Sequence, residues 1–158
     1  MARHSSGFQH ERIREDDSGN RLIVLKESKS RHGVVENQNL KAMKYNNSAV
    51  RMYKVLKGGS DGILRFLDRA IQIDPLCEAC HLNKAVILYN RKEYVQALES
   101  SNQAVRINPQ NPKAYLIRAK CNLKLNLKKD ARYDYKRLCE LGRMDFKTLM
   151  EIYKQKKL

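Results

Sequence analysis

Two stretches of this sequence repeat each other at a distance of 34 residues: Ala70-Ile-Gln-Ile-Asp-Pro75 and Ala104-Val-Arg-Ile-Asn-Pro109. Small residues at fixed places let two antiparallel helices approach closely, and a proline ends the second helix before the next pair begins. The same offset joins Leu64 to Leu98, Ala85 to Ala119, Ala97 to Ala131, and Ile107 to Leu141. A period of 34 residues therefore predicts an all-α solenoid built from antiparallel helix pairs.

The pattern resembles the tetratricopeptide repeat (TPR) family. Its repeats favour a large residue at position four, small residues at positions eight, twenty and twenty-seven, an aromatic residue at position twenty-four and proline at position thirty-two. Two repeats, 78–111 and 112–141, fit this pattern, although the second departs from it at Leu138 and lacks the closing proline. The residues that match are His81, Ala85, Ala97, Ala104 and Pro109 in the first of these repeats, and Tyr115, Ala119, Ala131 and Tyr135 in the second.

A third, divergent repeat is expected at about 44–77. It keeps Ala70 and Pro75 but places Arg51 and Ile63 at two positions where the family has small residues. The resemblance thus implies two and a half to three repeats, with the first helix of the first repeat the least regular part.

The sequence predicts three parts: an extended N-terminal arm (1–37), a TPR array (38–141), and a capping helix with a basic C-terminus (142–158). Seven helices are expected, at Gln38–Lys57, Ser60–Ile73, Cys77–Asn90, Tyr94–Ile107, Pro112–Leu125, Lys128–Leu141 and Asp145–Lys156. The last helix has an apolar stripe that is expected to cover the exposed end of the array, formed by Phe146, Leu149, Met150 and Tyr153. No apolar segment approaches the roughly 20 residues of a membrane span, so membrane insertion is not expected.

The net charge of +15 is concentrated near the C-terminus, where residues 112–158 carry fourteen Lys or Arg and five Asp or Glu. Clustered cations favour either an acidic protein surface or the phosphates of RNA. A basic face is predicted from Lys128, Lys129, Arg132, Lys136 and Arg137. Tyr133 is the aromatic side chain expected to be available for stacking on a base.

The segment Cys77-Glu-Ala-Cys80-His81 matches a haem-attachment pattern and supplies three possible zinc ligands. Haem attachment needs an oxidising compartment, and no export signal is expected because residues 1–14 lack an apolar segment. A fourth zinc ligand would have to be Cys121 or Cys139, so buried structural cysteines are preferred, with no metal and no cofactor. Four cysteines in a chain of this length indicate a reducing compartment, the cytoplasm or alternatively the mitochondrial matrix.

The TPR resemblance implies a concave groove lined by the first helix of each repeat. Transferred to this sequence, the groove consists of Leu82, Asn83, Val86, Tyr89 and Asn90 from the middle repeat, and Lys113, Leu116, Lys120, Leu123 and Lys124 from the last. Three lysines beside apolar residues suit an acidic partner segment with one or two apolar anchors.

One TPR subclass grips the C-terminal carboxylates of heat-shock chaperones with five polar residues. Asn83 and Lys113 match two of them, whereas Ser48, Met52 and Ile117 stand at the other three, with Arg118 one place late. Loss of three polar positions removes most of the charge-assisted hydrogen bonds of such a site.

The sequence contains no combination of nucleophile, base and orienting group, so a non-catalytic function is expected. The prediction is a TPR adaptor or scaffold subunit that holds other proteins, with acidic surfaces or segments, inside a larger assembly. Two alternatives are kept: an RNA-contacting component of a ribonucleoprotein such as a ribosome, and a chaperone adaptor. In the arm, Arg21–Lys26 is expected to form a strand or a partner-docking strip, and the apolar run Leu22, Ile23, Val24 and Leu25 is expected to dock on a neighbouring chain of that assembly.

Overall fold

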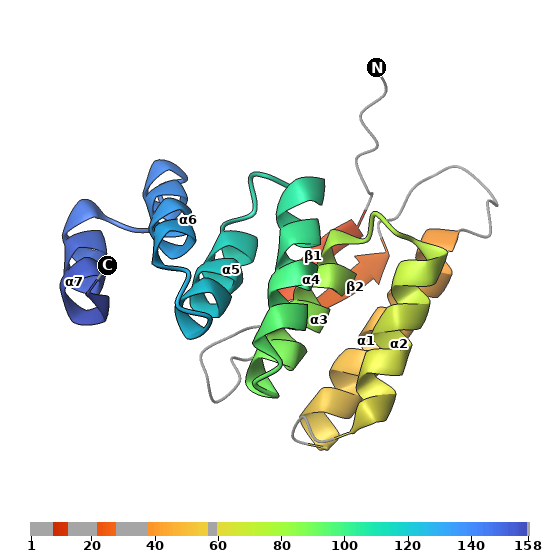
Figure 1. The fold of residues 1–158 in the computed structure, drawn as a ribbon. Helices are drawn as coiled ribbons and strands as arrows, with labels where there is room; N and C mark the ends of the chain where they lie inside the picture. Colours follow the sequence, from red (N-terminus) through yellow and green to blue (C-terminus); the bar gives the residue numbers. More distant parts are fainter. Residues whose placement is uncertain (1–7, 13–21, 28–37, 57–59, 158) are drawn as a thin grey trace. The chain divides into compact units, whose positions relative to one another are not determined.

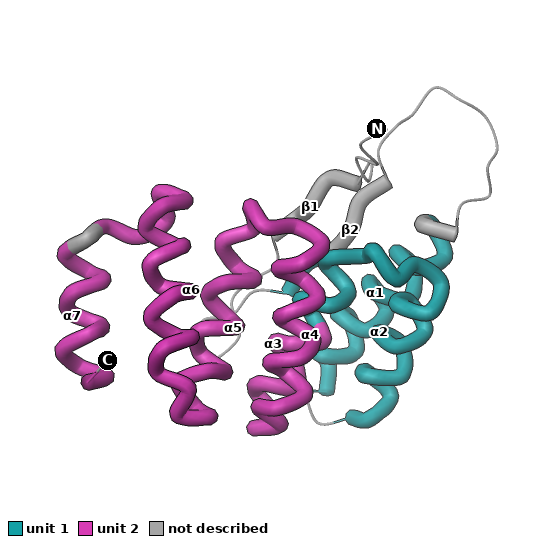
Figure 2. Tube along the Cα trace, turned by 45° about the horizontal axis from the view of Figure 1, so that its top comes forward, with its two compact units in different colours: residues 1–83 teal, residues 84–158 magenta. Residues whose placement is uncertain are grey.

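The computed structural model describes residues 8–12, 22–27, 38–56 and 60–157 of the 158-residue chain. The chain divides into two compact units, residues 1–83 and 84–158 (Figure 2). The described part of the array is all-α, and its six helices and the capping helix begin and end within two residues of the predicted bounds. Along the described residues, none of these helices is long and apolar enough to cross a membrane.

Unit 1 contains the helix pair α1 (Gln38–Val55) and α2 (Asp61–Ile73), which lie side by side (Figure 1). Helix α2 begins at the N-cap Ser60, whose side chain accepts a hydrogen bond from the Gly62 N–H. Tyr45 and Phe66 join the two helices through a tilted ring contact with centroids 6.0 Å apart. The first turn and a half of α3 (Glu78–Asn90) also belongs to this unit.

Helix α1 is complete, and its buried face corrects the predicted register of the first repeat. Five residues separate α1 from α2, whereas three separate α3 from α4 and α5 from α6. The two extra residues move the small position of the repeat from Arg51 to Ala49. Accordingly Ala49 is fully buried and Arg51 is exposed.

The arm contains a two-stranded antiparallel hairpin rather than only an extended chain. Strand β1 (Phe8–Arg12) pairs with β2 (Ile23–Glu27), with Arg12 opposite Ile23 and Phe8 opposite Glu27. Strand β2 packs against α1 of the same chain. Apart from Leu22, the remaining arm residues lie outside the part of the chain that the structure describes.

Unit 2 continues α3 and adds α4 (Tyr94–Ile107), α5 (Pro112–Lys124), α6 (Lys128–Glu140) and α7 (Phe146–Lys156). The turns after α3 and α5 are equivalent, since each has a left-handed middle residue, Lys92 and Asn126, at the 34-residue offset. In each turn the residue that follows donates its N–H back into the preceding helix, which is a common way to end a helix. The repeat is thus preserved in the backbone as well as in the sequence.

The capping helix closes the core of unit 2. Asp145 caps α7 by accepting the Thr148 N–H at 2.7 Å. Leu149 is buried with side chains of α5 and α6, and Ile152 and Tyr153 pack against the same cluster. Of the predicted stripe, Leu149 and Tyr153 take part, Met150 is exposed and Ile152 joins instead, while the Phe146 side chain lies outside the described ones. The core cluster consists of Tyr115, Ala119, Ala131, Tyr135, Leu138 and Leu149.

The register of α1 predicts a sharp difference between two leucine substitutions. Ala49→Leu adds volume at a fully buried helix contact and should lower the free energy of unfolding by about 1–3 kcal/mol. Arg51→Leu, on the exposed side of the same helix, should change it by less than about 0.5 kcal/mol. Urea unfolding followed by circular dichroism measures both values. A larger loss of unfolding free energy for Arg51→Leu than for Ala49→Leu would mean that Arg51, and not Ala49, lies at the helix contact.

Candidate functional site

The side-chain amide of Asn83, on α3, binds both main-chain polar groups of Ile23. Its Oδ1 accepts the Ile23 N–H at 2.7 Å, and its Nδ2 donates to the Ile23 carbonyl oxygen at 2.8 Å. Both residues are buried, with 0% of Asn83 and 2% of Ile23 exposed. One amide therefore recognises an extended residue through its donor and its acceptor together.

Asn46, on α1, completes this arrangement. Its Nδ2 donates to the same Ile23 carbonyl oxygen at 2.9 Å, and its Oδ1 accepts from Asn83 Nδ2 at 2.8 Å. A second bond, from Asn46 Nδ2 to Asn47 Oδ1 at 3.1 Å, uses its remaining proton. We call the side chains of Asn46 and Asn83 the asparagine clamp. Every hydrogen bond described here between the clamp and Ile23 comes from a neutral amide.

The β-hairpin presents Ile23 to the clamp in a defined way. In an antiparallel pair, alternate residues point their N–H and C=O toward the partner strand, and the others point away. The N–H and the C=O of Ile23 both bond to Asn83 rather than to β1. The pair of Ile23 and Arg12 is therefore a non-hydrogen-bonded pair of the antiparallel ladder. The outer edge of β2 is thus the edge that faces the helices of unit 1.

Sequence reasoning placed Asn83 in the groove but missed Asn46. In the corrected register Asn46 stands at position five of the first repeat, a groove position of the family, and Val50 stands at position nine. The ungapped register had put Ser48 and Met52 there. The signal that could have found Asn46 is the glycine-containing segment 56–60, which is two residues longer than the corresponding turns.

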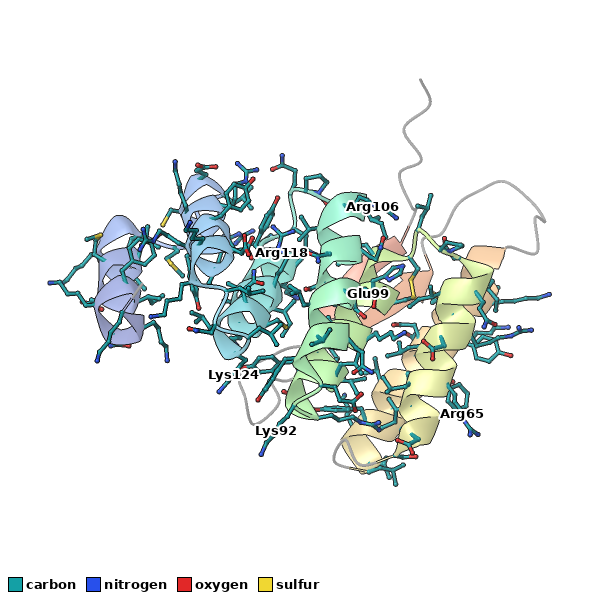
Figure 3. All side chains as sticks on the ribbon, viewed as in Figure 1. Arg65, Lys92, Glu99, Arg106, Arg118 and Lys124 are labelled. Carbon is teal, nitrogen blue, oxygen red and sulfur yellow. A yellow bond between two sulfur atoms is a disulfide. The ribbon has the colours of Figure 1, made fainter. Side chains whose placement is uncertain are left out.

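The predicted groove residues have different environments in the structure. Leu82, Asn83 and Val86 are buried, and Lys124 is exposed in the last turn of α5 (Figure 3). Leu116 and Leu123 pack against the core cluster of unit 2. The remaining members of the predicted groove are half-buried, namely Tyr89, Asn90, Lys113 and Lys120.

Three TPR domains of known structure are similar to this chain. They are the first TPR domain of Spaghetti (RPAP3) bound to the HSP90 peptide SRMEEVD, the first TPR domain of human RPAP3, and the TPR domain of Arabidopsis OM64. Their TM-scores are 0.68, 0.65 and 0.66, and their sequence identities are 23%, 24% and 20%. The matches cover 78%, 75% and 77% of this chain and 97%, 92% and 98% of theirs.

The chain has the TPR fold. No protein-family model and no curated protein matches its sequence. The TPR resemblance predicted from the 34-residue period is confirmed at the level of the fold.

Arg118, which stands one place from the chaperone-binding position, makes its contacts inside unit 2 (Figure 3). Its guanidinium binds the buried carboxylate of Asp134, with Nη2 to Oδ1 at 2.6 Å and Nε to Oδ1 at 3.0 Å. Burial raises the pKa of Asp134, while Arg118 and the Asn122 amide oppose that rise. Arg118 also lies over the Tyr115 ring at 5.3 Å. This arginine therefore stabilises the α5–α6 pair.

The predicted basic face on α6 is exposed at Lys128, Lys129, Arg132 and Lys136, and half-buried at Arg137. Three of these five cations also make contacts within the chain. Arg132 lies 5.6 Å from the Tyr153 ring, Arg137 pairs with Glu140 and lies over the Tyr115 ring, and Lys128 donates to the Lys157 carbonyl. Part of the charge on α6 thus has a structural role.

Cys77 and Cys80 form a disulfide, which differs from the buried free thiols that were expected. The two residues flank the first turn of α3, where the spacing brings their Cα atoms to 5.3 Å, within the range for a disulfide. This bond uses the two thiols that haem attachment or zinc would need. His81 Nε2 lies 2.9 Å from the Pro75 carbonyl oxygen. Among the described residues, no three His, Cys, Asp or Glu side chains are grouped to share a metal ion.

The other two cysteines are thiols with different surroundings. Cys121 is buried, and burial, with the nearby Asp134 carboxylate, raises its pKa to about 12. Cys139 is half-buried, and its pKa is raised chiefly by burial. Cys121 thus combines a very small thiolate fraction with little access to reagents.

Removing the clamp amide should release Ile23. Asn83→Ala leaves the Ile23 N–H without its acceptor, so its amide should exchange with solvent at least about tenfold faster, because an unpaired buried group costs about 1–3 kcal/mol. Asn102→Ala, at an exposed position of α4 where Asn102 Oδ1 accepts from Arg118 Nη1 at 3.3 Å, removes an amide hydrogen bond in unit 2 and is the matched control that should leave that exchange unchanged. Hydrogen exchange read by NMR makes the measurement. Equal exchange in the two variants would mean that Asn83 does not hold β2.

The cysteine environments predict an order of alkylation at pH 8. Iodoacetamide should modify Cys139 of the folded chain first, and Cys121 only after a denaturant is added, because its pKa is about 12 and it is buried. Cys77 and Cys80 should react only after reduction. Peptide mass spectrometry reads all four sites. Labelling of Cys121 before Cys139 would contradict the packing of α5.

Proposed function

We propose that this chain is a non-catalytic TPR adaptor that holds other proteins in a larger assembly by binding an extended segment of each partner. The asparagine clamp is the observation that supports this proposal most strongly. Asn83 and Asn46 bind the main chain of an extended residue through three hydrogen bonds. Main-chain recognition of this kind provides affinity for a strand-like peptide, and neighbouring pockets provide specificity.

The lysines predicted for the groove extend this proposal to acidic partners. Lys113, Lys120 and Lys124 come from one face of α5, and the net charge of the C-terminal third is strongly positive. Cations at the rim of a binding interface raise the rate at which an acidic segment associates more than they raise the affinity of the complex. These residues are proposed to steer a partner toward the array.

The chaperone adaptor is a weaker candidate. One similar domain, the first TPR of Spaghetti, is bound to the acidic HSP90 peptide SRMEEVD. In this chain the corrected first-repeat positions hold Asn46 and Val50, Ile117 is buried, and Arg118 is bound to Asp134. A carboxylate-ended peptide would therefore meet few of the cations that such recognition uses.

RNA binding is the second candidate, and a specific observation favours it. Lys129, Lys136 and Tyr133 are all exposed on α6, so two cations accompany an aromatic ring that is 57% exposed. Exposed rings beside cations are the usual elements of sequence-tolerant binding to single strands. This candidate predicts a steep loss of affinity with added salt.

The proposed location is a reducing compartment, the cytoplasm or the mitochondrial matrix. Four cysteines in a chain of this length do not form a secreted disulfide framework. The Cys77–Cys80 disulfide joins residues only three apart, so it restrains little of the unfolded chain, and we expect both cysteines to be thiols in such a compartment.

The test is affinity purification of the tagged full chain, followed by quantitative mass spectrometry with and without nuclease. The protein adaptor predicts that partners remain after nuclease treatment. It also predicts that Asn46→Ala combined with Asn83→Ala reduces their recovery at least about fivefold, because partners lose the main-chain hydrogen bonds. Asn102→Ala is again the matched control.

Two outcomes would contradict the adaptor. Release of all partners by nuclease would favour the RNA candidate, which also predicts that Lys129→Glu with Lys136→Glu abolishes recovery. Full recovery by the clamp variant would exclude the clamp as the binding site.

A further inference from the structure

The clamp that the proposed function assigns to partners is already filled by this chain. Ile23 occupies the Asn83 acceptor, the Asn83 donor and the Asn46 donor. Leu22 and Ile23 are 4% and 2% exposed, so the side chains beside this main chain are buried as well. In its geometry, β2 is therefore a bound peptide that belongs to the same polypeptide.

We infer that partners reach the clamp by displacing β2, and that the segment they insert is internal, extended and aliphatic. This inference rests on the proposed function and names the class of partner and its regulation. The hairpin residues 22–27 act as a built-in competitor, and the chemistry that holds Ile23 defines what can replace it.

The hydrogen-bonding groups of the clamp select an internal residue. Asn83 Oδ1 points at an N–H, so the bound residue must carry one, and proline is excluded. The carbonyl oxygen receives two neutral amide donors in a buried site. A terminal carboxylate there would bring a full charge into a site whose bonds come from neutral groups, and burying a charge without a counter-ion is costly.

The burial of the Ile23 side chain, of which 2% is exposed, selects an aliphatic residue. Strand β2 packs on α1, whose buried apolar positions include Met43 and Val50. Leu82 is buried one residue before Asn83 on α3. A charged or small side chain in place of Ile23 would either bury a charge or leave a cavity.

Strand β2 competes with partners for the clamp as part of the same chain, and this covalent connection makes the competition effective but reversible. Ten residues separate Glu27 from Gln38 in the sequence, and a short tether gives an effective concentration on the order of 1 mM. If β2 and a free segment each bind the open clamp with an intrinsic Kd of about 10 μM, the free segment would bind about 100-fold more weakly to the closed chain. The displaced hairpin itself is marginal, because an isolated two-stranded hairpin has little stability in water.

A peptide with the sequence of residues 21–28, RLIVLKES, labelled with fluorescein, is the probe. Its affinity is measured by fluorescence anisotropy for the full chain and for the full-length Ile23→Asp variant, in which a buried charge should drive β2 from the clamp. The variant should bind the peptide at least about tenfold more tightly than the unmodified chain. Ile23→Val, which keeps an aliphatic side chain, should bind like the unmodified chain.

Two further comparisons show that the peptide occupies the clamp. Adding Asn83→Ala to the Ile23→Asp variant should abolish the gain. A peptide with aspartate in place of its isoleucine should bind at least about tenfold more weakly, because it would bury a charge. Circular dichroism of each variant establishes that the helices are retained.

A measurement on the unmodified chain does not depend on any variant folding. Addition of the peptide to several mM, above the effective concentration of the tether, should accelerate hydrogen exchange at the Ile23 amide, because β2 leaves Asn83. Unchanged exchange at a peptide concentration that gives saturated binding would overturn the inference, since the peptide would then occupy a different surface.

The remaining outcomes separate this inference from the proposed function. Equal affinity of the peptide for the unmodified and Ile23→Asp chains would overturn the competition. Tighter binding of SRMEEVD than of RLIVLKES to the Ile23→Asp chain would overturn the aliphatic class. Either result leaves the adaptor function in place if the recovery of partners in the affinity purification still depends on Asn46 and Asn83. The adaptor function itself fails only if that recovery is independent of both asparagines.

Discussion

A buried asparagine amide must find partners for its oxygen and its two protons, and this constraint organises unit 1. Asn83 satisfies it with the main chain of Ile23 and with Asn46, which joins α1, α3 and β2 in one network. An amide buried without such partners costs about 1–3 kcal/mol or more, a large part of the stability of a small domain. The helices therefore need an extended main chain between them, supplied either by the chain itself or by another protein.

The helical array could be predicted from sequence because its information is local and repeated. Ala97, Ala104, Ala119 and Ala131 are fully buried where the 34-residue period placed small residues at helix contacts. Ala49 and Asn46 were missed because two extra residues before α2 shift the register of α1. A period is read correctly only as long as no turn changes its length.

The hairpin and the membership of the groove could not be predicted, for a different reason. The hairpin depends on contacts between residues that are not neighbours in the sequence. Strand β1 pairs with β2, and Ile23 bonds to Asn83 across 60 positions. The run Leu22–Leu25 was expected to dock on a neighbouring chain, whereas Leu22 and Ile23 are buried within their own unit. The side chains of Val24 and Leu25 lie outside the described ones. Leu116 and Leu123 were assigned to the groove from their repeat positions, but they pack with the core cluster that α7 completes.

The central claim is that Asn83 holds the main chain of Ile23 in the full chain, and an NMR experiment tests it most directly. In a ¹⁵N-edited NOESY spectrum of the unmodified full-length protein, the side-chain amide protons of Asn83 should show cross-peaks to the backbone of Ile23, because the atoms that bear and accept these protons are 2.8 Å apart. The Ile23 N–H resonance should also lie well away from its position in an unstructured peptide. The absence of these cross-peaks, together with an Ile23 resonance at the unstructured position, would contradict the account.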